Sequence, residues 1–479
     1  MYENWEVVIG LEIHVQLNTQ SKMFGTEPYH FGSEPNLDIG VVCTGQPGAL
    51  PVVNKEAVRK AVQFGCAVKA NVALVSRFDR KSYFYPDNPK NFQITQFDHP
   101  IIQGGTIMTE VNGQTMHFQI NRAHLEEDSG MLKHFTTFSG VDFNRAGVPL
   151  LEIVSEPCIH SPREAACYAM AIKAIMEYID ASDCNMDEGS LRMDANISVR
   201  PKGEQKLRTK VEIKNMNSFS HMETALESEI RRQVQFYTAN PHSDIERGTY
   251  RFDPETGTVI LMRLKEEAED YRYFPEPDLP PIELSLSYIE SIRSALPELP
   301  RDRYFRYLND LHIPEQPAFL LVNDKKLSDY FEEALKLCSN AKSLANWLTI
   351  EFPGRLKELG KPLSILPAAH IAELIRLIDT GAINGKIAKS VADEMVLHPD
   401  LPPTTIVDAN PDFKPLSDTS EIEALIDEVL TANPTAATDY KAGKQKAFAF
   451  LIGQVMKLSR GKASPDLVNS LLLKKLSSS

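Results

Sequence analysis

Several signatures of other protein classes are missing from this sequence of 479 residues. The longest apolar run, at residues 447–452, is far too short to cross a bilayer, so we expect no membrane-spanning helix. No basic segment followed by an apolar stretch opens the sequence, so we expect no signal peptide. The six cysteines form no C-x-x-C pair, which favours reduced thiols over disulfides or a structural zinc site. These absences predict a cytoplasmic location and no membrane partner.

The motifs of several enzyme classes are also missing. No G-x-x-x-x-G-K-[ST] motif occurs, so any use of ATP does not involve a P-loop. Kinase signatures of the H-R-D and D-F-G type are absent. The sequence has neither a G-x-S-x-G motif nor the Gly-Gly-Ser-Ser run that amidases use, and no cysteine stands in a glutaminase context. If the reaction needs an amide to be hydrolysed, we expect another polypeptide to do it.

Charge is distributed unevenly along the chain, whose net charge is −14. Residues 437–479 contain eight lysines and arginines against two aspartates, a net charge of +6, so the preceding 436 residues carry −20. A basic end on an acidic body indicates a polyanionic partner at that end. A solvated helical face would have the same composition, so charge alone leaves both interpretations open.

Two proline-rich stretches divide the chain. Residues 274–281 (FPEPDLPP) are not expected to form regular structure, and a second loop is expected at 397–415. Apolar residues that recur every three or four positions predict helices at Asn54–Ala70, Pro162–Ile179, Phe219–Tyr237, Tyr330–Leu337, Leu344–Ile350, Ala369–Ile378, Glu421–Leu430, Gln445–Leu458 and Pro465–Leu476. The predicted fold class is α+β: a mixed-sheet domain at 1–292, a helical domain at 293–410 and a small helical tail domain at 411–479.

The clearest local pattern is a strand at Val7–Leu17. Apolar residues alternate there with polar ones, so Glu12, His14 and Gln16 share one face of the strand. A carboxylate and an imidazole side by side can share a metal or hold a proton between them. An exposed sheet face with ordinary polar residues has the same pattern and is the simpler interpretation of this strand alone.

Three other predicted strands carry polar groups in the same way. Met193–Arg200 leaves Asp194 on its polar side, Leu207–Lys214 leaves Glu212, and His117–Leu125 ends at Glu126, Glu127 and Asp128. Carboxylates that converge repel one another unless a divalent cation lies between them. If the strands are neighbours, one oxygen-rich site with an imidazole could form, which favours Mg²⁺ or Mn²⁺ over zinc. Its ligands would be Glu12, His14, Glu127, Asp194 and Glu212.

Two further segments combine charged, aromatic and hydroxyl side chains. Arg80 and Lys81 precede the aromatic residues 83–85, and such groups can bind phosphates and stack on a base. A packed turn with surface ion pairs is the alternative. In the polar turn at 187–192, Ser190 and Arg192 could contact a nucleotide or an amino-acid moiety, although turns of this composition are common.

Long motifs identify a family that the chain resembles. VIGLEIHVQL, FDRKSYFYPDNPKNFQITQ, HLEEDSG, PLLEIVSEP, MDEGSLRMDANISVR, EIKNMNSF and DYRYFPEPDLP look like the B subunit of aspartyl/glutamyl-tRNA(Asn/Gln) amidotransferase. The segment KAFAFLIGQVMKLSRGKASPDLVNSLL is similar to the tail domain of that family, which binds the tRNA body. The resemblance covers essentially the whole chain. It implies a cradle-like N-terminal domain and a heterotrimer with an amidase-type A subunit and a small C subunit.

The resemblance also implies a reaction. The side-chain carboxylate of misacylated Glu-tRNA(Gln) or Asp-tRNA(Asn) is phosphorylated by ATP with Mg²⁺, and ammonia that the amidase-type partner releases from glutamine then displaces the phosphate. This makes the family a carbon–nitrogen ligase with glutamine as amido donor. It assigns metal ligation to Glu12, His14, Glu127, Asp194 and Glu212, with Glu126 as a possible substitute for Glu127, because the phase of that strand is ambiguous.

The remaining roles are expected for residues beside the metal. Catalytic roles fall to Lys81, Glu127, Ser190 and Arg192, and nucleotide binding falls to Arg80 and Lys81. A lysine beside Mg²⁺ can stabilise charge that develops on a transferred phosphoryl group. The cysteine spacing does not support the zinc site that some members carry.

Two other functions remain compatible with these residues. The chain could be a tRNA-binding scaffold without chemistry of its own, which the basic tail supports equally well but the acidic strand faces do not. It could also be a metal-dependent hydrolase that uses Glu12 and His14, which would need no ATP. The sequence does not indicate which misacylated tRNA is the natural substrate.

Overall fold

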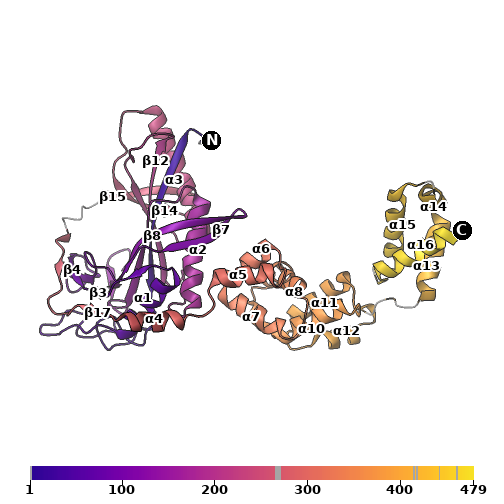
Figure 1. Cartoon of the computed structure of the whole chain (residues 1–479), viewed down its shortest axis with the longest axis horizontal. Helices are drawn as coiled ribbons and strands as arrows, with labels where there is room; N and C mark the ends of the chain where they lie inside the picture. Colours follow the sequence, from indigo (N-terminus) through magenta and orange to yellow (C-terminus); the bar gives the residue numbers. More distant parts are fainter. Residues whose placement is uncertain are drawn as a thin grey trace. The chain divides into compact units, whose positions relative to one another are not determined.

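The chain forms two compact units, Met1–Arg303 and Tyr304–Ser479, in this computed structural model. The structure describes residues 3–264, 271–413, 416, 419–441, 443–459 and 462–478. For residues 263, 264, 441 and 478 it describes only the backbone. The α+β class predicted from the sequence is confirmed, because the strands lie in the first unit and the second is built of helices (Figure 1).

A ten-stranded mixed sheet forms the first unit. Only the β13–β14 pair is parallel among its described pairings, and β7 (Thr106–Val111) joins the sheet by pairing with β8. In spatial order the other strands are β15 (Thr258–Leu264), β14 (Gly248–Asp253), β13 (Val211–Lys214), β12 (Leu191–Pro201), β1 (Trp5–Gln16), β11 (Pro149–Ser155), β8 (Gln114–Glu127), β6 (Ile102–Gln103) and β2 (Asn71–Val72).

Strand β1 lies in the middle of the sheet, and its side chains alternate between a buried face and a polar face. Ile9, Leu11, Ile13 and Val15 are fully buried, whereas Glu12 and His14, which alternate with them, are only partly buried. The strand predicted at Val7–Leu17 and its alternation are therefore confirmed. The alternation assigns every polar side chain of the strand to the same side of the sheet.

Three helices of the first unit were predicted from the sequence and are confirmed: α1 (Lys55–Ala67), α2 (Pro162–Tyr178) and α3 (Phe219–Ala239). All three pack against the sheet (Figure 1). Each begins at a side-chain cap. Asn54 accepts hydrogen bonds from two backbone N–H groups of α1, and Ser161 and Ser218 do the same for single N–H groups of α2 and α3. Such caps satisfy donors that the first helical turn leaves unpaired, which is why the predicted starts are accurate.

Short strands complete the unit: β3 (Val75–Ser76), β4 (Asp79–Ser82), β5 (Phe92–Thr95), β9 (Met131–His134), β10 (Ser139–Asp142), β16 (Phe274–Pro275) and β17 (Ile282–Glu283). Two predictions need correction: the absence of regular structure at 274–281 and the start of one strand. The stretch 274–281 begins with β16, which pairs with β4, because a proline is tolerated where a strand needs no N–H bond. The strand predicted at Leu207–Lys214 begins only at Val211.

The second unit contains two hydrophobic cores. Residues 304–407 supply the first, with Tyr307, Phe331 and Phe352 fully buried, and residues 422–476 supply the second. Helices α4 (Leu286–Ser294) and α5 (Pro300–Asn309) lie in the boundary region between the units. The second unit then contains α6 (Glu315–Val322), α7 (Lys325–Leu335), α8 (Ala341–Asn346), α9 (Phe352–Glu358), α10 (Ala368–Asp379), α11 (Gly385–Leu397), α12 (Pro403–Ala409), α13 (Thr419–Ala432), α14 (Pro434–Lys441), α15 (Gln445–Leu458) and α16 (Pro465–Ser478).

Helix α12 contradicts the loop predicted at 397–415. Pro402 and Pro403 stand at its N-cap and first position, where the missing N–H of proline costs nothing. Residues 414 and 415 of the predicted loop lie outside the described residues. Within the part of the chain that is described, no helix has the length and apolarity that a bilayer crossing requires.

Candidate active site

Five adjacent strands bring the predicted polar residues to one face of the sheet. Glu12 of β1 stands opposite Asp194 of β12, and His14 stands between Arg192 of β12 and Glu152 of β11. The row of His14 continues outward, because Glu152 is also opposite His124 of β8. Glu212 of β13 lies in the next row from Glu12, because it is opposite Asn196, which pairs with Gly10 of β1. Residues far apart in sequence thus meet through strand register alone.

Glu12, Asp194 and Glu212 form one group, which we call the acidic cluster. Each offers a carboxylate oxygen that lies within 4.8 Å of the others. Asn196 Nδ2 donates to Glu12 at 2.8 Å, and Lys214 Nζ donates to Asp194 at 2.5 Å and lies 3.4 Å from Glu212. Burial opposes a charge on Lys214, but the two carboxylates outweigh it and raise the pKa of the lysine. The cluster contains three carboxylates and one lysine, so its excess negative charge would favour a further bound cation.

His14, Glu126 and Glu152 form a second group, the histidine cluster, in which each residue again offers a ligand atom within 4.8 Å of the others. His14 Nε2 lies 3.4 Å from Glu152 Oε2 and 3.8 Å from Glu126 Oε1. Burial opposes protonation of His14, but its hydrogen bond to Glu152 and the charges of both carboxylates raise its pKa to about 9. Burial and Glu152 raise the pKa of Glu126.

Both clusters fit a hard divalent cation better than zinc. Their donors are carboxylate oxygens with a single imidazole, and no thiol is among them. The clusters are offset by two residues along β1, which corresponds to about 7 Å. Two separate cation positions, rather than the single convergent site expected from the sequence, are therefore available on this face.

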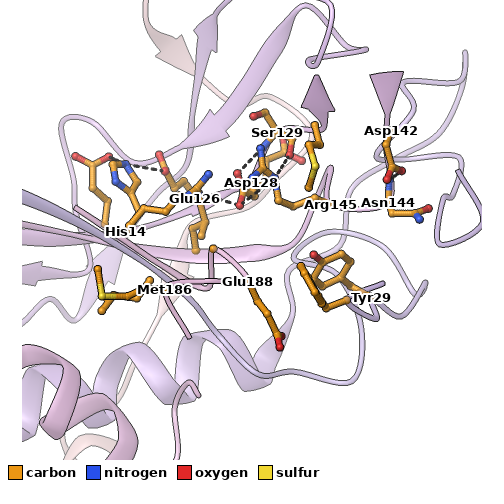
Figure 2. A pocket seen from close by; sticks show the side chains of 18 of the residues that line it. His14, Tyr29, Glu126, Asp128, Ser129, Asp142, Asn144, Arg145, Met186 and Glu188 are labelled. Atoms are coloured by element: carbon orange, nitrogen blue, oxygen red, sulfur yellow. Dashed lines mark hydrogen bonds and ion pairs between the residues drawn. The ribbon is translucent and has the colours of Figure 1, made fainter. Parts of the chain in front are cut away.

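A cavity of about 1040 Å³ opens over the histidine cluster and Asp194 (Figure 2). Lys81 and Arg192 line it together with His14, Glu126 and Glu152. Lys81 Nζ lies 4.8 Å from the centre of the Tyr271 ring. Burial opposes the charge of Lys81, but Tyr273, Glu126 and Glu152 outweigh it and raise its pKa. The cavity therefore places Lys81 near Glu126 and Glu152, and Arg192 near Glu126 and Asp194.

Asp128 holds part of the cavity wall together. It accepts hydrogen bonds from Arg192 Nη2 at 2.8 Å and Gln16 Nε2 at 3.0 Å. Arg145 Nε lies 3.6 Å from the same carboxylate (Figure 2). Burial alone would raise the pKa of Asp128, but the two arginines hold it below its usual value. Arg192, predicted to be catalytic, thus lines the cavity with its guanidinium fixed by a buried carboxylate.

The structure places Glu127, Ser190 and Arg80 differently from the other predicted residues. Glu127 lines the cavity, but its Oε1 accepts from Ile94 N at 2.9 Å and lies 2.6 Å from Lys90 Nζ, outside both clusters. Glu126 takes the place beside His14.

Ser190 and Arg80 have structural partners. Ser190 Oγ donates to Asp183 at 2.5 Å and accepts from Asn185 N at 2.7 Å, which closes the turn before β12, and Ser190 lines a neighbouring hollow of about 430 Å³. Arg80 Nε donates at 2.6 Å to Glu276, which directly follows β16, so Arg80 links that segment to β4. It is not among the residues that line the large cavity.

Glu152 was not among the residues predicted for the site. Its signal is visible in β11, where Leu151 and Ile153 are buried and Glu152 alternates with them. The pattern matches that of Glu12 in β1, so the same argument from period two would have found it.

Comparison with known proteins gives consistent matches along the chain. Residues 7–290 match the family described as the GatB/GatE catalytic domain, and residues 329–476 match the GatB domain. The chain is 64% identical to the B subunit of aspartyl/glutamyl-tRNA(Asn/Gln) amidotransferase from Protochlamydia amoebophila, over 99% of this chain and 97% of that protein. Proteins of the same name from Chlamydia abortus and Chlamydia caviae are 56% and 54% identical, and both alignments cover at least 99% of each chain.

The matched domains define the class, which is that of amidotransferase subunits with a GatB-type catalytic domain. More specifically, the chain belongs to the B-subunit family of aspartyl/glutamyl-tRNA(Asn/Gln) amidotransferases, as the family resemblance of its motifs had indicated.

Proposed function

We propose that this chain is the phosphorylating and amidating subunit of a glutamine-dependent aminoacyl-tRNA amidotransferase. It uses ATP to activate the side-chain carboxylate of Glu-tRNA(Gln), Asp-tRNA(Asn) or both, and ammonia then replaces the phosphate. The observation that carries the proposal is the pair of clusters on one sheet face, at a cavity that Lys81 and Arg192 also line.

The chemistry explains why such a site is needed. A carboxylate resists attack by ammonia because an oxide would have to leave, whereas an acyl phosphate offers phosphate as the leaving group. Phosphoryl transfer depends mainly on positioning and on neutralising negative charge. Mg²⁺, when bound, would supply this neutralisation at the phosphate oxygens.

The residues of the chain have distinct roles in this scheme. Glu12, Asp194 and Glu212 hold one cation, and His14, Glu126 and Glu152 hold the other. Lys81 faces the cavity and stabilises charge on the transferred group. Arg192, fixed by Asp128, orients an anionic part of the substrate from the opposite strand.

Partners follow from the missing amide chemistry and from the basic end of the chain. Ammonia comes from an amidase-type A subunit, which acts with a small C subunit in a heterotrimer in the cytoplasm. Residues 411–479, proposed as the tail domain, bind the tRNA body through their positive charge. This division also assigns 1–292 to the cradle-like catalytic domain and 293–410 to the helical domain.

The experiment is reconstitution with the A and C subunits and amidation of each misacylated tRNA with ATP and glutamine. Glu12→Ala and Glu212→Ala should abolish amidation and leave tRNA affinity nearly unchanged. Glu6→Gln is the matched control, because Glu6 also lies on β1 but pairs with Arg200 at 2.9 Å, away from the clusters. Normal turnover in both Glu→Ala variants would instead favour a scaffold that only presents tRNA.

The tail is tested separately by deleting residues 411–479. Each phosphate contact contributes about 0.7 to 0.9 to the slope of log affinity against log salt concentration, so the deletion should weaken tRNA binding and flatten this slope. An unchanged slope would exclude the tail from the binding surface.

A further inference from the structure

Another histidine lies beside the histidine cluster, on the same face of the sheet. His124 is on β8, opposite Glu152 in the register between β8 and β11. Its Nε2 lies 3.3 Å from Glu152 Oε2 and 3.8 Å from Glu126 Oε2. His124 is only 4% exposed and does not line the large cavity, whereas His14, Glu126 and Glu152 all do.

One carboxylate oxygen thus lies between two imidazoles. Glu152 Oε2 is 3.4 Å from His14 Nε2 on the cavity side and 3.3 Å from His124 Nε2 on the buried side. The two rings are not equivalent, because only His14 belongs to the group whose ligand atoms all lie within 4.8 Å of one another. A cation bound from the cavity would reach His14 directly and His124 only through Glu152.

The contacts of the ring indicate which nitrogen carries the proton. An ionised carboxylate only accepts hydrogen bonds, so Nε2 of His124 must be the donor. Nδ1 is buried, and no described residue provides it with a partner. With the proton on Nε2, the buried Nδ1 has only an unpaired acceptor lone pair and no unpaired N–H donor. The contacts of Nε2 with the carboxylates are then the polar interactions that orient the ring.

We propose that His124 is a positioning residue that fixes the orientation of the Glu152 carboxylate for cation binding. It does so by donating Nε2–H to Oε2 from the neighbouring strand β8, while Glu152 lies beside His14 on its other side. The inference rests on the proposed function, in which the histidine cluster holds a cation. Partners of this kind behind a metal ligand typically change metal affinity about 10- to 100-fold when they are lost.

The test uses two amide substitutions in the full-length chain. A glutamine amide nitrogen can replace Nε2 as the donor to Glu152, whereas the shorter asparagine places its amide nearer the position of Nδ1. We expect His124→Asn to weaken Mn²⁺ binding at the histidine cluster about 10- to 100-fold. We expect His124→Gln to bind Mn²⁺ nearly as well as the wild type. Binding at the acidic cluster, followed in the same titration, serves as the internal control.

Three results would overturn the inference while leaving the proposed function intact. Equal Mn²⁺ affinity in the wild type and His124→Asn would show that Glu152 needs no support, and equal loss in both variants would show that the donor position is irrelevant. Direct coordination would appear in wild-type protein with ¹⁵N-labelled histidine as loss of the Nε2 proton when diamagnetic Mg²⁺ binds. This measurement also decides the question if His124→Asn does not fold. Wild-type protein that binds no Mn²⁺ would overturn the proposed function itself, and with it this inference.

Discussion

Arg80 and Lys81 are neighbours in sequence, and the structure predicts opposite consequences for their loss. Successive side chains of β4 point to opposite sides. Arg80 contacts Glu276 at 2.6 Å, and the side chain of Glu276 is completely buried. Arg80→Met would leave that carboxylate without its partner, which typically costs about 3 to 5 kcal/mol. Lys81→Met removes a charge that faces the cavity, so stability should change little and turnover should fall on the order of a hundredfold.

Thermal unfolding and the amidation assay distinguish the two outcomes. For a unit of this size about 1 kcal/mol corresponds to roughly 2 °C, so Arg80→Met should lower the melting temperature by about 6 to 10 °C. Its KM for ATP should stay unchanged in the folded fraction. An Arg80→Met protein as stable as the wild type but with a raised KM for ATP would refute this reasoning and return Arg80 to the nucleotide site.

Three further outcomes follow from single side chains. Lys214→Met removes the ammonium that competes with a cation for Asp194. Since a partly exposed ion pair contributes at most about 1 kcal/mol, Mn²⁺ titration without nucleotide should show affinity raised up to about fivefold. Ser190→Ala should lower stability by about 1 kcal/mol, measured by denaturant unfolding, without changing kcat. Lys389 and Arg355 lower the pKa of Glu351. The ionised Glu351 therefore stabilises the fold above its usual pKa of 4.5, and this stabilisation is lost as pH falls through the lowered pKa. In Glu351→Gln the loss of stability in acid should be smaller by at most about 1 kcal/mol.

Period-two alternation made much of the site predictable from sequence. It correctly separated Glu12 and His14 from the buried residues of β1, because one face of that strand packs inside and the other carries the two clusters. At the end of β8 the alternation did not show which side chains face the site. Residues 123–128 are all buried, so polarity no longer distinguishes the faces, and Glu126 and Glu127 could not be told apart.

Contacts that depend on distant segments were beyond the sequence. Arg80 has its partner, Glu276, almost 200 positions later, directly after β16, in a stretch whose prolines had suggested no regular structure. Ser190 could be seen in a turn, but its bond to Asp183 depends on how that turn closes. Helix starts, in contrast, were predicted closely where a cap such as Ser161 follows from local residues alone.

The most direct test of the central claim is a Mn²⁺ binding isotherm for the full-length chain, in which two cation positions should appear. Glu12→Gln should weaken one of them and Glu152→Gln the other, each leaving the remaining position intact. Isotherms for both variants that coincide with the wild-type curve would contradict cation binding by these clusters, and the catalytic assignment would fail with it.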